Sequence, residues 1–234
     1  MTEQNRRDFL KAAGVGSALA LAGCLADDGE TADPTDRTIN LGLLMGVTGG
    51  LQELGPPIRD AAQLVPQQFE DADTNLQVDS QFEDTETQAT VGVSGAEALD
   101  DAGYPMIAGA LASNVSLQVA EDVAIPRGIP MVTPASTAPE YSELDGDWTF
   151  RTAVPDSFQG QLLARIAAER LEADSVAAIA QDDAYGQGLS GAFVDAFESE
   201  HGGEASEPVI FAQGETSYTS QLESALADDP DVLL

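Results

Sequence analysis

Positive charge is almost missing from this sequence of 234 residues. Nine lysine and arginine residues face 41 aspartate and glutamate residues, so the formal net charge at pH 7 is -32. The phosphate backbone of a nucleic acid would be repelled by such a chain, which excludes nucleic acid as the expected partner. The carboxylates are spread along the whole chain, so we expect a solvated acidic surface. Self-repulsion of this size is screened by molar salt, which suggests a halophilic protein.

Cysteine and histidine each occur once, which removes most of the chemistry that an enzyme or a metal site would need. The lone Cys24 excludes a disulfide framework and a cysteine-rich metal site. The only histidine, His201, lies beside two glycines, and we expect it in an exposed surface turn. Residues 92–96 (GVSGA) and 188–192 (GLSGA) lack the last glycine of a serine-hydrolase elbow. We therefore expect a binding protein without a cofactor, and not an enzyme.

Long hydrophobic runs are also absent, and the apolar run near the N-terminus is too short for a spanning helix, which needs about 20 residues. Arg6 and Arg7, followed by Asp-Phe-Leu-Lys, resemble a twin-arginine export signal, and the small residues before Cys24 resemble a lipobox. We therefore expect residues 1–23 to be a cleaved signal peptide and Cys24 to carry lipid. Residues 24–36 would be an acidic tether that holds the folded body at the outer face of the cell membrane.

From Ile39 onward, short apolar runs alternate with amphipathic stretches, as in parallel sheets with crossover helices. The rhythm restarts after Pro155, so the pattern predicts an α/β fold with a first lobe at 37–153 and a second at 154–234. The chain stops inside an apolar strand, which predicts an incomplete second lobe and a fragment or early-terminated reading frame. Strands are expected at 39–45, 76–82, 104–111, 128–133, 148–157, 175–180, 207–212 and 231–234. Helices are expected at 58–71, with a kink at Pro66, and at 87–101, 114–124, 158–171, 188–199 and 218–227.

Small and hydroxyl-bearing residues dominate the loops after these strands, where ligands of open parallel sheets bind. Ser113 stands where a strand passes into a helix, so its side chain and the following N–H groups could face a carboxylate. In residues 131–140, MVTPASTAPE, the Ala135 carbonyl has no assigned partner, and the Thr137 hydroxyl and N–H lie nearby. One loop thus offers an acceptor and donors, which suits an ammonium beside a carboxylate. The alternative is that Ser113 is an N-cap and Thr137 a turn residue.

Five segments together resemble the leucine/isoleucine/valine-binding branch of the type I periplasmic binding proteins, which are extracytoplasmic receptors of ABC transporters. They are GVTGGLQELG (46–55), IAGALASNVS (107–116), GIPMVTPASTAPE (128–140), FRTAVPDSFQGQ (150–161) and AQDDAYGQGL (180–189). The resemblance implies a two-lobed type I periplasmic-binding-protein fold that closes around an amino acid. It also implies an ABC permease at the membrane as partner. A ligand-binding sensory module without transport is the alternative function.

The resemblance also implies roles for single residues on the first lobe. Ser113 would bind the ligand carboxylate, the backbone of Ala135 would take the ammonium, and Thr137 would contact both. Asn114 and Ser136 adjoin these residues and are further candidates for ligand binding.

On the other wall, the resemblance places Tyr185 in the side-chain pocket. Leu54 stands where some members carry an aromatic wall, which leaves branched-chain, polar and amide ligands all open. Related receptors take their acidic partner for the ammonium from sequence that would lie beyond residue 234, and no replacement for it is expected within this chain.

Overall fold

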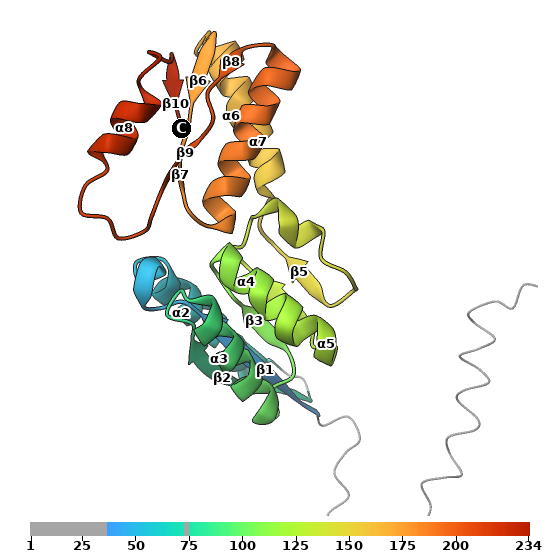
Figure 1. The fold of residues 1–234 in the computed structure, drawn as a ribbon. Coiled ribbons are helices and arrows are strands. Elements are labelled where there is room, and N and C mark those ends of the chain that lie inside the picture. The colour runs from blue at the N-terminus through green and yellow to red at the C-terminus, as the bar shows by residue number, and fades with distance from the viewer. Residues whose placement is uncertain (1–36, 73–74) are drawn as a thin grey trace, which may run out of the picture. The chain divides into compact units, whose positions relative to one another are not determined.

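Parallel strands form three sheets in the computed structural model, which describes residues 37–72 and 75–234 (Figure 1). Residues 37–234 make up one compact unit. The predictions on Arg6, Arg7, Cys24 and the tether at 24–36 lie outside the described residues. Over the described ranges, no helix combines the length and the apolar character needed to cross a membrane.

The largest sheet has five strands in the order β2-β1-β3-β4-β5, and every neighbouring pair is parallel. The strands are β1 (Arg37–Met45), β2 (Leu76–Asp84), β3 (Ile107–Gly109), β4 (Met131–Thr133) and β5 (Thr149–Arg151). Because all strands run the same way, the loops that follow them gather at one edge of the sheet.

Helices connect these strands, as expected for parallel pairs, which need a crossover. They are α2 (Gly55–Asp71), α3 (Ala89–Asp101), α4 (Ser113–Val119), the π-helical η3 (Ala120–Ala124) and α5 (Ile125–Arg127). Two short 3-10 turns, η2 (Gly49–Leu51) and η4 (Pro139–Ser142), lie in loops at the carboxyl edge. The expected helix at 58–71 begins three residues earlier, because Pro56 and Pro57 suit the first helical positions. Pro66 lies inside α2, which continues on both sides of it.

Side-chain alternation along β1 divides the core into two layers. Leu43 and Met45 point to the face covered by α2, where they pack with Ile58 and Ala62. Leu44, between them, points to the opposite face and packs against α3 and α4. The sheet is therefore buried on both faces here, which explains the unbroken apolar run of the β1 sequence.

The remaining residues build two smaller parallel sheets, β10-β6-β8 and β7-β9. Their elements are α6 (Asp156–Arg170), β6 (Ser175–Ala177), β7 (Ile179–Gln181), α7 (Ala184–His201), β8 (Glu204–Ala205), β9 (Val209–Phe211), α8 (Thr219–Ala225) and β10 (Val232–Leu233). Helices α6 and α7 lie side by side (Figure 1). Gly160 permits this contact, because a Cβ there would come within 2.6 Å of the Phe193 nitrogen.

Three expectations differ from the structure in this part of the chain. The strand expected at 148–157 is only β5, because Pro155 ends the extended segment and serves as the N-cap of α6. The single strand expected at 175–180 divides into β6 and β7, which belong to different sheets. His201 is the last residue of α7 and is half-buried, not exposed in a turn.

Candidate ligand-binding site

A cavity of about 390 Å³ lies where the loops after β1, β3, β4, β7 and β9 meet. The parallel topology brings these loops together although they are far apart in the sequence. Five of the residues expected to bind the ligand line this cavity, namely Leu54, Ser113, Ala135, Thr137 and Tyr185.

The Ser113 hydroxyl joins two of these loops. Its oxygen accepts hydrogen bonds from the backbone N–H groups of Thr137, at 3.1 Å, and Ala138, at 3.3 Å. With both lone pairs used, the hydroxyl hydrogen remains free to donate to a ligand oxygen. The N-cap of α4 is Ala112, so the alternative interpretation of Ser113 as an N-cap is wrong.

Thr137 is available to a ligand through its side chain only. Its N–H, which the sequence offered as a donor, is used by Ser113, and its carbonyl accepts from the Asp156 N–H at 2.8 Å. The Thr137 hydroxyl is buried and has no hydrogen-bond partner among the described residues. The Ala135 carbonyl likewise accepts no hydrogen bond within the described part of the chain. Ala135 and Thr137 both line the cavity, so its lining residues include one unused acceptor and one unused hydroxyl.

Asn114 and Ser136 do not line the cavity. Ser136 is fully buried, and its hydroxyl takes part in a network with Ser116, Thr133 and the Leu111 carbonyl. This network fixes the loop after β4, so Ser136 shapes the site without reaching it. A small hydroxyl residue in a loop can either contact the ligand or hold the loop in place, and only the folded structure distinguishes these two roles.

A carboxylate at the end of β2 holds the loop 46–52 in place. Asp84 accepts hydrogen bonds from the backbone of Val47, Thr48 and Glu86 and from the Thr48 hydroxyl. Burial would raise the pKa of this carboxyl, but the hydrogen bonds outweigh burial and the pKa is lowered. Asp84 therefore stays charged at neutral pH and positions one wall of the cavity.

A buried acid, Asp156, lies beside the Thr137 hydroxyl, although it does not line the cavity and our sequence reasoning did not single it out. It is the first residue of α6 and is fully buried. One carboxylate oxygen accepts from Gln159 at 3.2 Å, and the other, Oδ2, has no partner among the described residues. Burial raises the pKa of Asp156, while the adjacent Thr137 hydroxyl and the charge of Arg151 oppose this effect. The sequence signal that could have identified Asp156 is its position directly after Pro155, close to the start of a predicted helix.

Leu54 and Tyr185 face the cavity from opposite parts of the fold and are about half exposed. Tyr185 lies in the first turn of α7, whose N-cap Asp183 accepts the Gly186 N–H at 2.7 Å. Burial first, and then the charges of Asp156 and Asp183, raise the pKa of the Tyr185 phenol, so it remains a donor at neutral pH.

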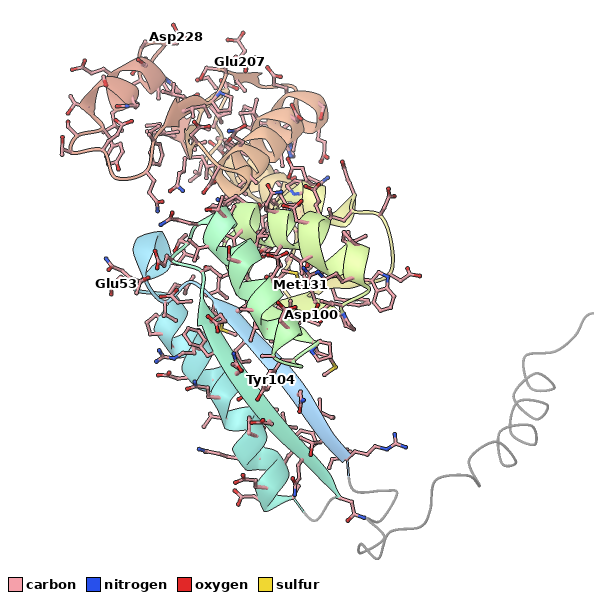
Figure 2. All side chains as sticks on the ribbon, turned by 60° about the horizontal axis from the view of Figure 1, so that its bottom comes forward. Glu53, Asp100, Tyr104, Met131, Glu207 and Asp228 are labelled. Carbon is pink, nitrogen blue, oxygen red and sulfur yellow. The ribbon has the colours of Figure 1, made fainter. Side chains whose placement is uncertain are left out.

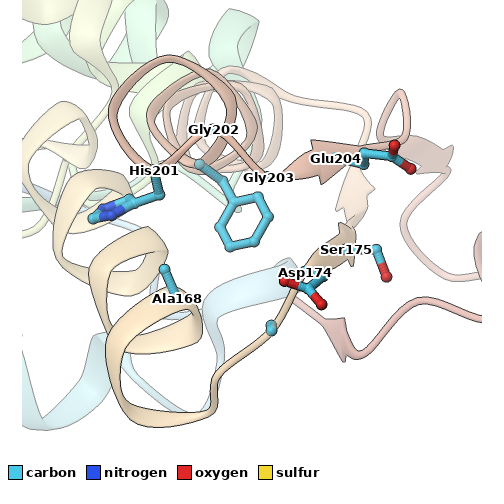
Figure 3. A pocket seen from close by; sticks show the side chains of 9 residues that line it. Ala168, Asp174, Ser175, His201, Gly202, Gly203 and Glu204 are labelled. Atoms are coloured by element: carbon cyan, nitrogen blue, oxygen red, sulfur yellow. The ribbon is translucent and has the colours of Figure 1, made fainter.

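A second cavity, of about 440 Å³, lies at the far ends of α6 and α7 from these loops. Figure 3 shows His201 on one side of it, with Ser175 and Glu204 on the other. None of the expected ligand-binding residues lines it. Within the described ranges, no group of histidine, cysteine and acidic residues could hold a metal ion.

Sequence comparisons match residues 38–234 to the model of the periplasmic binding protein family and residues 3–23 to the twin-arginine translocation signal. A Leu/Ile/Val-binding protein homolog of Brucella melitensis is 27% identical over 157 residues, which are 66% of this chain and 42% of that protein. A leucine-, isoleucine-, valine-, threonine- and alanine-binding protein of Pseudomonas aeruginosa is 28% identical over 74% of this chain and 46% of its own length. The chain thus spans about half the length of these relatives, which are solute-binding proteins and not enzymes.

Solved structures agree with these matches. A leucine-binding protein of Thermotoga maritima superimposes with a TM-score of 0.75 at 29% identity, over 83% of this chain and 55% of that one. A branched-chain amino acid binding protein of Streptococcus pneumoniae, solved with isoleucine, has the same fold at 21% identity, with a TM-score of 0.73, over 84% of this chain and 56% of that one. Through residues 38–234, the chain therefore belongs to the periplasmic binding protein family, in its type I branch.

Proposed function

We propose that this chain is the extracytoplasmic substrate-binding protein of an ABC transporter and captures an α-amino acid of the branched-chain type in the cavity. The observation that carries the proposal is the set of unused polar groups on the first wall, namely the Ser113 O–H, the Ala135 carbonyl and the Thr137 hydroxyl. These groups match an α-amino acid, which presents a carboxylate and an ammonium on one carbon. The names of the relatives supply the ligand class and the transporter.

In the proposed complex, the ligand carboxylate accepts a hydrogen bond from Ser113. The ammonium donates hydrogen bonds to the Ala135 carbonyl and to the Thr137 hydroxyl oxygen. The Thr137 hydroxyl can then donate its own hydrogen to the Asp156 carboxylate. The ligand side chain extends toward Leu54 and Tyr185. Because α6 and α7 supply one wall and the five-stranded sheet supplies the other, movement about residues 152–156 would close the site and present the closed form to a permease.

Replacing Ser113 or Thr137 by alanine is expected to weaken amino-acid binding by roughly 10- to 150-fold, because each hydrogen bond to a charged group contributes about 1.5–3 kcal/mol. Isothermal titration calorimetry with leucine, isoleucine and valine measures the change. The matched control is Ser94→Ala on α3, where the hydroxyl donates only to the Thr90 carbonyl of its own helix. Wild-type affinity in both site variants would remove these residues from the binding site.

Attachment by lipid to Cys24 extends the proposal to the membrane. The match of residues 3–23 to the export signal supports delivery outside the cytoplasm, and Cys24 follows that match directly. Cys24→Ser should abolish incorporation of labelled fatty acid and release the exported protein into the medium. Because the sequence holds no other cysteine, any labelled lipid that is bound through a cysteine sulfur of the parent protein must be on Cys24. A serine variant that stays in the membrane fraction would contradict the lipid anchor.

A further inference from the structure

The two walls of the cavity differ in chemistry. The wall from the five-stranded sheet contributes apolar side chains beside the backbone-binding groups, among them Leu51, Leu54 and Leu111. The wall from the other part of the chain contributes side chains that each carry a hydrogen-bonding group, one of them on an aromatic ring. They are Gln159, Gln181, Asp183, Tyr185 and Gln213.

The three glutamines on this second wall keep unused acceptors. Gln159 donates through Nε2 to the Val154 carbonyl and to Asp156, and Gln181 donates through Nε2 to Asp183. In the described part of the chain, no hydrogen bond reaches the amide oxygen of Gln159, Gln181 or Gln213. Each of these oxygens can still accept from a donor that enters the cavity.

Gln213 also bridges the two walls. A Cβ placed on Gly50 would lie 2.0 Å from the Gln213 Nε2 atom, so the amide lies directly against the glycine backbone. Gln213 follows β9, whereas Gly50 follows β1, and both line the cavity. A ligand held between the walls therefore has this amide beside it.

Charge on the second wall is limited to Asp183, whose carboxylate already accepts from the Gly186 N–H and from Gln181. No lysine or arginine lines the cavity. An acidic ligand side chain would find no cationic partner there, whereas a neutral hydroxyl or amide would find acceptors.

We infer that the cavity prefers an amino acid with a neutral, hydrogen-bonding side chain over an aliphatic one of the same shape. This inference rests on the proposed capture of an α-amino acid, and it replaces the branched-chain side chain of that proposal by a neutral, hydrogen-bonding one. An aliphatic side chain would cover the amide oxygens without replacing their bonds to water, which carries a penalty that a hydroxyl or amide avoids. The wall of glutamines thus works against the aliphatic ligands named for the relatives.

Shape-matched pairs of ligands test the preference on the whole chain. Threonine and valine, asparagine and leucine, and glutamine and methionine differ mainly in hydrogen-bonding capacity. We expect the polar member of each pair to bind about tenfold more tightly, as measured by calorimetry. Lysine serves as a fourth probe, and it should bind more weakly than glutamine.

The variant Gln213→Leu should reduce the glutamine-to-methionine preference, because it removes one acceptor at nearly constant volume. The matched control is Gln187→Leu, in the same part of the fold, where the exposed glutamine bonds Asp182 and does not line the cavity. We expect the control to leave the preference unchanged. The same reduction in both variants would overturn the role of Gln213.

The outcomes separate the two proposals. Equal or tighter binding of the aliphatic members, or tightest binding of lysine, would overturn this inference and leave amino-acid capture intact. If no amino acid of the set bound, the proposed function itself would fail, and the preference with it. Tighter binding of all three polar members supports amino-acid capture and this preference, and it removes the branched-chain side chain from the proposed function.

Discussion

Lowering the potassium chloride concentration from about 1 M to about 0.1 M is expected to unfold residues 24–234, because the Debye length grows from roughly 3 Å to roughly 10 Å. After removal of residues 1–23, six basic residues remain against 39 acidic ones, which gives a formal charge of -33. Glu53, Glu207 and Asp228 illustrate how the carboxylates stand on the outer surface (Figure 2). Molar salt screens the repulsion among these carboxylates. In dilute buffer the same repulsion acts across the whole surface.

Ion pairs can offset little of this repulsion. Over the described residues, Arg59 and Arg127 are the only arginines in ion pairs, and Arg127 already serves both Glu97 and Asp100. Exposed pairs of this kind contribute at most about 1 kcal/mol each. The remaining carboxylates depend on dissolved cations for compensation.

Circular dichroism at 222 nm across the salt range measures the transition. Betaine at the osmolality of the high-salt buffer is the control, since a neutral solute reduces water activity without screening charge. We expect betaine not to restore the folded signal. A spectrum that is unchanged between the two salt concentrations would contradict the halophilic interpretation.

Much of the fold could be predicted from the sequence because apolar runs and amphipathic stretches differ in period. The run 39–45 and the helical spacing from Ile58 onward identify β1 and α2 within a few residues. The family resemblance of the five segments agrees with the matched family model. The division at residues 153 and 154, which falls between β5 and α6, stays a prediction.

Boundaries and pairings were harder, because they depend on tertiary contacts. No local signal tells that β6 and β7, separated only by Ala178, join different sheets. The glycines that follow His201 predict an exposed turn there, yet α7 continues to this residue and Gly202 takes the left-handed C-cap position.

At the site, the sequence indicated which loops meet around the cavity, but not which of their polar atoms lack a hydrogen-bond partner. Ser113 and Thr137 both line the cavity, as expected, but the bond between them consumes the Thr137 N–H. Ser136 looked equivalent to its neighbours and is enclosed in a buried network. Burial and hydrogen-bond partners follow from the packing of distant segments, which local patterns do not encode.

Replacing Asp156 by asparagine is expected to weaken leucine binding by roughly 30- to 5,000-fold, the range for removing one partner of a buried charge pair. The carboxylate oxygen Oδ2 and the Thr137 hydroxyl are both buried and form no well-aligned hydrogen bond among the described residues, yet the hydroxyl is close enough to the carboxylate to lower its pKa. A buried charge needs compensation. In our proposal the ligand ammonium supplies it through the hydroxyl of Thr137, because Asp156 itself does not line the cavity.

A ligand without the ammonium isolates this effect. The 2-oxo acid of leucine, 4-methyl-2-oxopentanoate, keeps the carboxylate and the side chain, so its affinity should be nearly the same in the parent and in Asp156→Asn. Asp182→Asn is the matched control, since Asp182 is an acid on the same part of the fold that bonds Gln187 and does not line the cavity. The control changes the net charge equally, and we expect it to leave both affinities unchanged.

Thermal stability distinguishes this role from a structural one. Burial raises the pKa of Asp156 in the folded protein above that of the unfolded chain, so between these two pKa values the native state holds a proton that the unfolded state has lost, and above them the carboxyl is charged in both states. The stability that this carboxyl contributes is therefore lost as the pH rises from the unfolded pKa through the raised folded pKa. Asparagine does not ionise, so Asp156→Asn should melt at a higher temperature than the parent at pH 7 in molar salt.

A structural residue would lose affinity and stability together, whereas the proposed charge partner loses affinity for leucine while stability increases. Differential scanning fluorimetry and calorimetry on the same samples measure both quantities. A lower melting temperature with equal losses for leucine and for its 2-oxo acid would assign Asp156 to the fold alone. If Asp156→Asn kept the leucine affinity of the parent, another residue would have to supply the negative charge that compensates the ligand ammonium.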